Sequence, residues 1–357
     1  MPRSRLPGHE AASGPEATRS PTSPAPAPTP TPTPTPGPAH ASPSPVRAAD
    51  AARPARAEPP ETLEGWYALH QAWRVDRRAV RRLSEGERHA VAREAIETLE
   101  GLSTPRALPG VDDGTDGPGW TAVAELTGSA ADVLVVQFRP TLDRLGAAQR
   151  ALGAAQLAEY LVPVRSFLSV TEAGLYHITA AVAAAREAAG GVVGDAEYRS
   201  AIGERAAAER GSPHVRRRLY PPRPADMPYI CFYPMSKRRA PGQNWYALTL
   251  GERSRLMQAH GETGRRYAGR VQQVITGAIG LDAWEWGVTL FAREPLEFKR
   301  LVTDMRFDEV SAQYAEFGEF YVGRIMEPAD WVRRLLGLDQ GPQAGAEDGR
   351  APRTARG

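Results

Sequence analysis

The segment Tyr229–Lys237, YICFYPMSK, carries reactive and charged side chains at alternating positions. Because successive side chains of a strand point to opposite faces, Tyr233, Met235 and Lys237 share a face if the strand continues through Pro234. A buried tyrosine hydroxyl needs a partner, and a lysine beside it favours a bound anion. The segment therefore predicts a site that combines a phenol with a cation. A core tyrosine beside a surface lysine is the alternative interpretation.

His260 is the histidine whose position favours a buried ligand. It lies in a predicted helix, 248–271, one turn after Leu256, so it shares the inward apolar stripe of that helix. We expect Gly261 and Gly264 to break the helix, with Gly261 ending it behind the histidine. A haem iron needs one such axial histidine. The alternative interpretation is an ordinary core histidine that is hydrogen-bonded and binds no metal. The remaining histidines lie in the N-terminal leader or lack neighbours at metal-ligand spacing: His9, His40, His70, His89, His177 and His214.

The composition excludes several classes of protein. The 357 residues are 41% hydrophobic and 24% charged, with a net charge of +2, which does not indicate a nucleic-acid-binding protein. No apolar run approaches the roughly 18–20 residues of a membrane span, and the N-terminus lacks a signal-peptide core. One cysteine, Cys231, allows no disulfide framework and no thiolate metal site. We therefore expect a cytoplasmic protein.

Two copies of one pattern are predicted to position these residues. The first copy has expected strands and helices, in chain order, at 65–75, 84–102, 120–128, 131–140, 141–161 and 164–170. The second has them at 229–235, 248–271, 272–280, 285–291, 295–314 and 319–324. Each order is βαββαβ, and the short turns between adjacent strands imply antiparallel hairpins. The predicted fold class is α+β: two tandem ferredoxin-like units whose open sheets pack on each other or edge to edge.

The composition and the repeated pattern together predict the domain organisation. Residues 1–60 hold 17 of the 33 prolines and are predicted to be a disordered leader, or a docking segment for a proline-reading partner. An N-terminal unit is expected at 61–173 and a C-terminal unit at 226–326. A charged, poorly patterned segment, 174–225, connects them, and 338–357 is expected to be a loose tail.

The motifs of the second copy resemble the chlorite dismutase superfamily, and within it the coproheme decarboxylase branch, also called HemQ. They are YICFYPMSKRR, NWYALTLGERSRLMQAHGETGRRYAG, QQVITGAIGLDAWEWGVTLF and PLEFKRLVTDMRFDEVSAQYAEFGEFYVG. Weaker similarity in the first copy lies in TLEGWYALHQAWRVD, FRPTLDRL and RRRLYP. The resemblance covers roughly residues 62–325. It implies a dimeric α+β barrel with haem in the C-terminal unit.

The resemblance also assigns roles to individual residues. His260 matches the axial iron ligand and Tyr233 matches the catalytic tyrosine. Chlorite-degrading relatives carry an arginine where this chain has Gln273. The other matches are the propionate contacts Arg218, Tyr220, Lys237 and Ser311, the pocket residues Met235 and Gln273, and Trp284 near the proximal side.

This chain departs from the family pattern at two places. One residue is inserted between Tyr220 and Tyr233, within PPRPADMP, which bears on the alignment of Arg218 and Tyr220. Phe167 stands in VRSFLSV, where family members often have tyrosine, so we expect one propionate hydrogen bond to be missing.

The function implied is the oxidative decarboxylation of two propionates of iron coproporphyrin III, which is both substrate and redox cofactor. Hydrogen peroxide is the implied co-substrate and haem b the product. Coproporphyrin ferrochelatase is the implied upstream partner, and a homopentamer is the implied assembly. Two alternatives stay open: a haem peroxidase or chlorite dismutase on the same fold, which the neutral Gln273 disfavours, and a non-enzymatic haem-binding protein.

Overall fold

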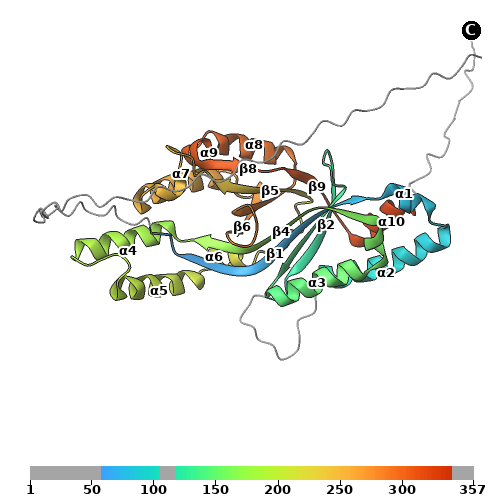
Figure 1. Cartoon of the computed structure of the whole chain (residues 1–357), viewed down its shortest axis with the longest axis horizontal. Coiled ribbons are helices and arrows are strands. Elements are labelled where there is room, and N and C mark those ends of the chain that lie inside the picture. Colours follow the sequence, from blue (N-terminus) through green and yellow to red (C-terminus); the bar gives the residue numbers. More distant parts are fainter. Residues whose placement is uncertain (1–57, 105–116, 340–357) are drawn as a thin grey trace, which may run out of the picture. The chain divides into compact units, whose positions relative to one another are not determined.

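The structure is a computed structural model that describes residues 58–104 and 117–339 (Figure 1). The predicted leader, 1–60, and tail, 338–357, lie almost entirely outside these ranges, so both stay predictions. In the described ranges, no helix has the combined length and apolarity that crossing a membrane requires.

The first half of the described chain forms a four-stranded antiparallel sheet. Strand β1 (Thr62–Val75) pairs with β4 (Leu161–Gly174) on one side and with β3 (Val133–Arg139) on the other, and β3 pairs with β2 (Trp120–Leu126). The spatial order β4-β1-β3-β2 is that of a ferredoxin-like unit. The ferredoxin-like unit predicted for this half from its βαββαβ order is therefore confirmed.

The second half repeats the arrangement. Strand β5 (Tyr229–Lys237) pairs with β9 (Tyr321–Met326) and β7 (Trp286–Ala292), and β7 pairs with β6 (Val271–Gly277). The order β9-β5-β7-β6 matches that of the first half. A short extra strand, β8 (Ala315–Phe317), pairs with the C-terminal end of β5.

The two sheets join edge to edge at both sides and close a barrel. Strand β2 pairs with β9 from Val123↔Met326 onward, and β4 pairs with β6 through Val170↔Gly277 and Thr171↔Thr276. Eight of the nine strands form this ring, and β8 lies outside it. Closure gives each edge strand a partner.

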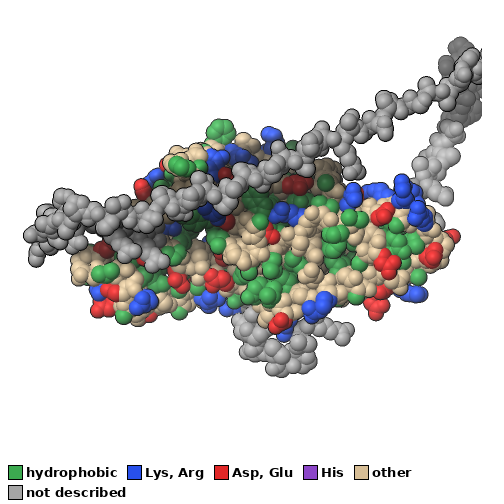
Figure 2. Space-filling model, viewed as in Figure 1, with side chains coloured by type: hydrophobic (Ala, Val, Ile, Leu, Met, Phe, Trp, Pro, Cys, Tyr) green, Lys and Arg blue, Asp and Glu red, His purple; other side chains and the backbone are tan. Residues whose placement is uncertain are grey.

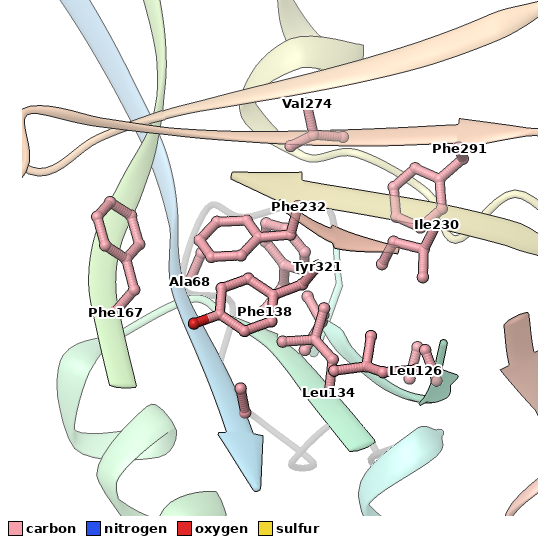
Figure 3. Close-up of a cluster of buried hydrophobic side chains, with 14 of the residues drawn as sticks. Ala68, Leu126, Leu134, Phe138, Phe167, Ile230, Phe232, Val274, Phe291 and Tyr321 are labelled. Atoms are coloured by element: carbon pink, nitrogen blue, oxygen red, sulfur yellow. The ribbon is translucent and has the colours of Figure 1, made fainter. Parts of the chain in front are cut away.

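The barrel interior is apolar and aromatic. Alternate residues of the strands point into it, and Figure 3 shows Phe138, Phe167, Phe232 and Phe291 converging there. His70 is also inside. Its Nε2 lies 2.8 Å from Thr289 Oγ1, and its ring stacks on Phe232 with centroids 4.1 Å apart. Burial lowers the pKa of His70 to about 3, so this imidazole is a neutral core residue, as expected of a histidine without metal-ligating neighbours.

Helices cover the outer faces of the barrel. The first half carries α1 (Arg77–Arg82), α2 (Glu85–Ser103), α3 (Leu142–Ala154) and the 3-10 helix η1 (Gln156–Tyr160). The predicted helix 141–161 is thus two helices, separated at Ala155. A capping box of Ser84 and Glu87 begins α2, and a helix that was not predicted, α10 (Pro328–Leu336), packs on α2.

No helix or strand was predicted in the charged, poorly patterned connecting segment, 174–225. It contains three helices, α4 (Tyr176–Ala188), α5 (Ala196–Arg210) and α6 (Pro213–Leu219). Alanine-rich runs with high helix propensity form α4 and α5, and Asp195 caps the start of α5. The apolar periodicity of α5 is weak and gave no helix signal, whereas that of α4 is comparable to the predicted helix α3 and was overlooked.

Helix α7 (Leu250–Arg265) corrects the prediction about its glycines. It begins at a capping box of Thr249 and Glu252 and continues through Gly261 and Gly264 without a break. A Cβ atom at Gly264 would lie 3.3 Å from Met305 Cε and 3.4 Å from Gln273 Nε2. Gly264 therefore lets the side chains of Met305 and of Gln273 in β6 lie against the backbone of α7, which is a different role from ending a helix.

The last predicted helix, 295–314, is also two helices. Helix α8 (Leu296–Arg306) ends before Asp308, whose side chain caps α9 (Glu309–Tyr314) by accepting the Ser311 N–H. The 3-10 helix η2 (Trp245–Ala247) lies in the connection from β5 to α7. In the view of Figure 2, basic and acidic side chains are interspersed over the visible face, with a basic group over α1.

Candidate functional site

The outer face of the second sheet carries the predicted chemistry. Strand β5 runs through Pro234, so Tyr233, Met235 and Lys237 emerge on one face, and Tyr233 packs in an apolar cluster with Val288 of β7. The intervening Phe232 faces the barrel interior. The alternation that the sequence predicts is therefore present, and the site lies between the sheet and helices α7 to α9 (Figure 1).

Tyr233 is a buried phenol on this face. It is 7% exposed, and its ring stacks on Phe320 with centroids 4.4 Å apart. Burial raises the pKa of Tyr233 well above its usual range, although Arg306 opposes the shift. The phenol is therefore protonated at neutral pH. Its hydroxyl has no hydrogen-bond partner within residues 58–104 and 117–339, so it is available to a ligand.

Lys237 is a buried ammonium without an anionic partner. Its side chain lies with Nζ 4.5 Å from the centroid of the Trp245 ring, and the residue is 9% exposed. Burial lowers the pKa of Lys237 to about 8, despite the opposing charges of Asp308 and Glu285. Within the described part of the chain, Nζ makes no ion pair or hydrogen bond. A buried cation of this kind is costly unless an anion binds it, so the geometry favours a carboxylate or phosphate ligand.

Glu285 lies close to Lys237 but is engaged elsewhere. One carboxylate oxygen accepts the backbone N–H of Lys237 at 2.6 Å, and the other pairs with Arg239. The residue is 4% exposed. Glu285 therefore fixes the end of β5 while it leaves the ammonium of Lys237 free for a ligand.

His260 lies on α7 and is oriented by a carboxylate. Its Nδ1 lies 2.9 Å from Asp308 Oδ2, and its side chain is 30% exposed. Burial raises the pKa of Asp308, but hydrogen bonds from His260 and the Ser311 N–H hold it below its usual value. An ionised carboxylate only accepts, so Nδ1 of His260 donates to it and Nε2 is directed away from Asp308. This is the arrangement in which histidine binds a metal through Nε2.

Asp308 was missed by the sequence analysis. It lies 48 positions after His260, and no spacing rule connects the two. The available signal was its place three residues before Ser311, which is typical of a helix N-cap. Ser311 is 6% exposed, and its Oγ lies 3.5 Å from Asp308 Oδ2. The predicted residues His260 and Ser311 are thus brought together by a carboxylate that was not predicted.

Gln273 lies on the same face as Tyr233, two strands away. It pairs with Leu290 of β7, which in turn pairs with Cys231 of β5. Its side chain reaches α7 near Gly264. Trp284, in contrast, packs beside Gly318 and against the barrel-interior cluster, so it lies on the barrel side of the sheet rather than beside α7.

Arg218 and Tyr220 lie at the end of α6. The ring of Tyr220 packs edge-on against Trp66 of the barrel, with centroids 5.7 Å apart. Arg218 is exposed and lies in the field of Glu172. The carboxylate of Glu172 accepts a hydrogen bond of 2.7 Å from Trp286 Nε1, and Trp286 pairs with Met235. Arg218 is therefore connected to the site face through Glu172, whereas Tyr220 is placed at the end of the barrel.

A second feature of Glu172 is its proton affinity. Burial raises the pKa of this carboxyl, the hydrogen bond from Trp286 lowers it, Glu64 raises it and Arg218 lowers it, with a net rise. Glu172 is thus a titratable acid at the edge of the same face.

The described residues contain no group of three or more His, Cys, Asp or Glu side chains that could hold a metal ion. A single imidazole is instead the protein ligand that an iron already held in a porphyrin requires. The face therefore offers one imidazole, one neutral phenol, one amide and one unpaired cation, which together suit a metalloporphyrin with acidic arms.

Comparison with known proteins agrees with this chemistry. The chain is 39% identical over 266 residues to the coproheme decarboxylase of Staphylococcus carnosus (strain TM300), covering 74% of this chain and 94% of that protein. It is 39% identical over 267 residues to the protein of that name in Staphylococcus saprophyticus, covering 75% of this chain and 94% of the relative.

Solved structures share the fold. A novel heme-binding protein from Thermus thermophilus superposes with a TM-score of 0.64 at 38% identity, covering 79% of this chain and 100% of that one. A mutant chlorite dismutase from Candidatus Nitrospira defluvii superposes with a TM-score of 0.55 at 16% identity, covering 77% of this chain and 97% of that one, which establishes similarity of fold. The family model described as chlorite dismutase matches residues 88–326. The chain belongs to the chlorite dismutase family.

Proposed function

We propose that this protein is a coproheme decarboxylase, which converts iron coproporphyrin III to haem b with hydrogen peroxide as oxidant. The observation that carries the proposal is the unpaired, buried ammonium of Lys237 on the same strand face as Tyr233. A substrate with carboxylate arms supplies the missing anion and brings an arm close to the phenol. The name borne by the two staphylococcal relatives supports the same substrate.

In this proposal His260 binds the iron of the substrate through Nε2. Asp308 holds the proton on Nδ1 and makes the imidazole a stronger donor to the metal. The bound iron, with peroxide, supplies the oxidising equivalents. Lys237 and Ser311 bind acid arms, and Arg218 does so from the rim beside Glu172. Each charge-assisted hydrogen bond of this kind contributes roughly 1.5–3 kcal/mol.

Tyr233 is the proposed catalytic residue. Its neutral O–H loses a hydrogen atom to the oxidant, and the resulting phenoxyl radical takes one from the β-carbon of a propionate. Loss of CO2 and of a second electron leaves a vinyl group. For each arm, –CH2–CH2–COO⁻, H2O2 and one proton give –CH=CH2, CO2 and two H2O. A carboxylate fixed by Lys237, on the same face of the strand, holds the reacting carbon close to the phenol.

Gln273 supports decarboxylation over chlorite dismutation. Its amide is neutral, so it provides no positive charge for an anionic oxyhalide, which an arginine would provide. Tyr220 and Met235 are proposed to line the porphyrin. We further propose a homopentamer in the cytoplasm that receives its substrate from coproporphyrin ferrochelatase, with units at 61–173 and 226–326 joined by 174–225.

The test is direct. Purified protein is mixed with iron coproporphyrin III and hydrogen peroxide, and the porphyrin is followed by mass spectrometry for the loss of two carboxyl groups. If the porphyrin binds but its mass does not change, the protein is a non-enzymatic haem-binding protein. If the protein releases dioxygen from chlorite, it is a chlorite dismutase. Either result contradicts the proposal.

A further inference from the structure

Trp245 lies beneath the ammonium of Lys237 and is itself 1% exposed. It begins η2, and its backbone N–H donates to the carbonyl of Arg238 at 3.0 Å. The preceding Asn244 caps this turn by accepting the Tyr246 N–H at 3.0 Å. The loop after β5 thus folds back so that the indole face meets the side chain of Lys237.

The same indole contacts the helices that carry the other proposed site residues. It packs in one buried cluster with Leu256 of α7 and with Val310 and Tyr314 of α9, and the Tyr314 ring centroid is 5.7 Å away. Leu256 lies one turn before His260, and Val310 precedes Ser311. One side chain therefore links the cation to the elements that carry the imidazole and the hydroxyl.

We propose that Trp245 is a positioning residue for the substrate's acid arm: its ring holds the Lys237 ammonium charged and at a fixed place relative to His260 until a carboxylate binds. This inference rests on the proposed function. It adds a residue that contacts neither the iron nor the reacting carbon but sets the geometry of the cation.

The other charged groups near Lys237 do not replace the indole. Asp308 is hydrogen-bonded to His260 and to Ser311, and Glu285 is hydrogen-bonded to the Lys237 backbone and paired with Arg239. In the neighbouring strand β8, Glu316 pairs with Arg238 at 3.9 Å. In the cluster packed around Trp245, the titratable side chains are the phenols of Tyr176, Tyr246 and Tyr314, and the buried Arg253 of α7 lies in the field of Tyr176.

The aromatic face opposes the effect of burial. Desolvation favours the neutral amine, whereas the ring quadrupole of an indole stabilises the cation. An ordinary core tryptophan would contribute apolar contact only, and leucine would replace much of that contact. The two roles therefore differ in what happens to the proton of Lys237.

The chain is suited to a direct test because it contains two lysines, Lys237 and Lys299, among 44 basic residues. Protein labelled with 13C at lysine Cε gives one signal for each lysine, and the signal from Lys299 is the internal control. In porphyrin-free wild type, we expect Lys237 to titrate near pH 8, where burial places its pKa. In Trp245→Leu we expect its midpoint to fall by roughly one pH unit, and in Trp245→Phe by less.

A second measurement follows binding of iron coproporphyrin III across the pH range in which Lys237 loses its proton. We expect Trp245→Leu to bind roughly fivefold more weakly at a pH near the wild-type midpoint, and to add no further loss in a Lys237→Gln background. An unchanged Lys237 midpoint in both Trp245 variants, or an equal loss of binding with and without Lys237, overturns the inference.

The Phe variant keeps the test valid if the Leu variant does not fold, because a phenylalanine ring preserves apolar packing with a weaker quadrupole. The two proposals also fail separately. If wild type does not bind iron coproporphyrin, the proposed function fails. The porphyrin-free titration still tests whether the Trp245 indole stabilises the charged form of Lys237. If wild type makes haem b but the titration is insensitive to Trp245, the positioning role alone fails.

Discussion

Asp308 Oδ2 lies 2.9 Å from Nδ1 of His260, and the same carboxyl group accepts the Ser311 N–H at 2.9 Å through its other oxygen. One acid therefore orients the imidazole and begins the helix that carries the serine. Because His260 and Ser311 share Asp308, a substitution of either residue would disturb the position of the other.

The first prediction concerns this acid. Asp308→Asn keeps the shape but removes the charge, so Nδ1–H loses a charged acceptor and the imidazole becomes a weaker donor to iron. We expect affinity for iron coproporphyrin to fall roughly 10- to 100-fold. Difference spectra of the complex measure the affinity and the ligand field together. Unchanged spectra and affinity would show that Asp308 only caps the N-terminus of α9 and does not tune the imidazole.

The second prediction concerns Tyr233→Phe. The phenol has no hydrogen-bond partner in the described part of the chain, so its removal leaves no buried group unsatisfied and the fold should retain its stability within about 0.5 kcal/mol. Binding of iron coproporphyrin should persist, and release of CO2 with peroxide should cease. Mass spectrometry of the porphyrin over time is the measurement. Vinyl products at the wild-type rate would remove Tyr233 from the mechanism.

The third prediction is a pH dependence. Burial lowers the pKa of Lys237 to about 8, below its ordinary 10.5, so the ammonium is charged below that pH and loses its proton as pH rises through it. Carboxylate binding requires the charge. Affinity for iron coproporphyrin should therefore be constant well below this pKa and decline above it.

Lys237→Arg is the matched control, because a guanidinium does not deprotonate in this range. The variant should lose the decline even if its affinity changes. The pH dependence of stability has the opposite sign. Between pH 8 and pH 10.5 the unfolded chain binds more protons at Lys237 than the folded chain does. The contribution of Lys237 to the free energy of unfolding therefore rises with pH. Denaturant titrations of wild type and variant would reveal that difference.

The fourth prediction uses two glycines of α7. A Cβ at Gly264 would lie 3.3 Å from Met305 Cε and 3.4 Å from Gln273 Nε2, so Gly264→Ala must displace two packed side-chain ends and should stabilise the helix less than Gly261→Ala does. Gly261→Ala meets only the flexible end of Arg265 at 3.3 Å, and should stabilise the helix by about 0.5–1 kcal/mol. Thermal unfolding compares them. Equal effects of the two changes would contradict the close approach described here.

Strand β5 shows what the sequence could predict. Alternation alone placed Tyr233 and Lys237 on one face, because a period of two is a local property of the chain. The order of strands in each half followed from similar local patterns. Closure of the barrel was implied by the family resemblance, and local patterns left edge-to-edge joining as one of two alternatives, because the pairs Val123↔Met326 and Val170↔Gly277 join segments far apart in the sequence.

The site shows the same limit. His260 could be selected from its helical stripe, whereas Asp308 is identified only by the tertiary contact between α7 and α9. The glycines of α7 were misjudged because helix propensity ranks glycine by its cost in isolation. In the folded chain that cost is offset by the close packing that Gly264 allows against β6.

The seam between β4 and β6 is only two residue pairs long. Glu172 reaches from β4 across Gly277 of β6 to Trp286 of β7, and a Cβ at Gly277 would collide with its carboxylate. A hydrogen bond that crosses the joint in this way ties the amino-terminal repeat to the carboxy-terminal one. Without the amino-terminal repeat, strands β9 and β6 of the second sheet would be unpaired edges, so neither repeat is an independent module.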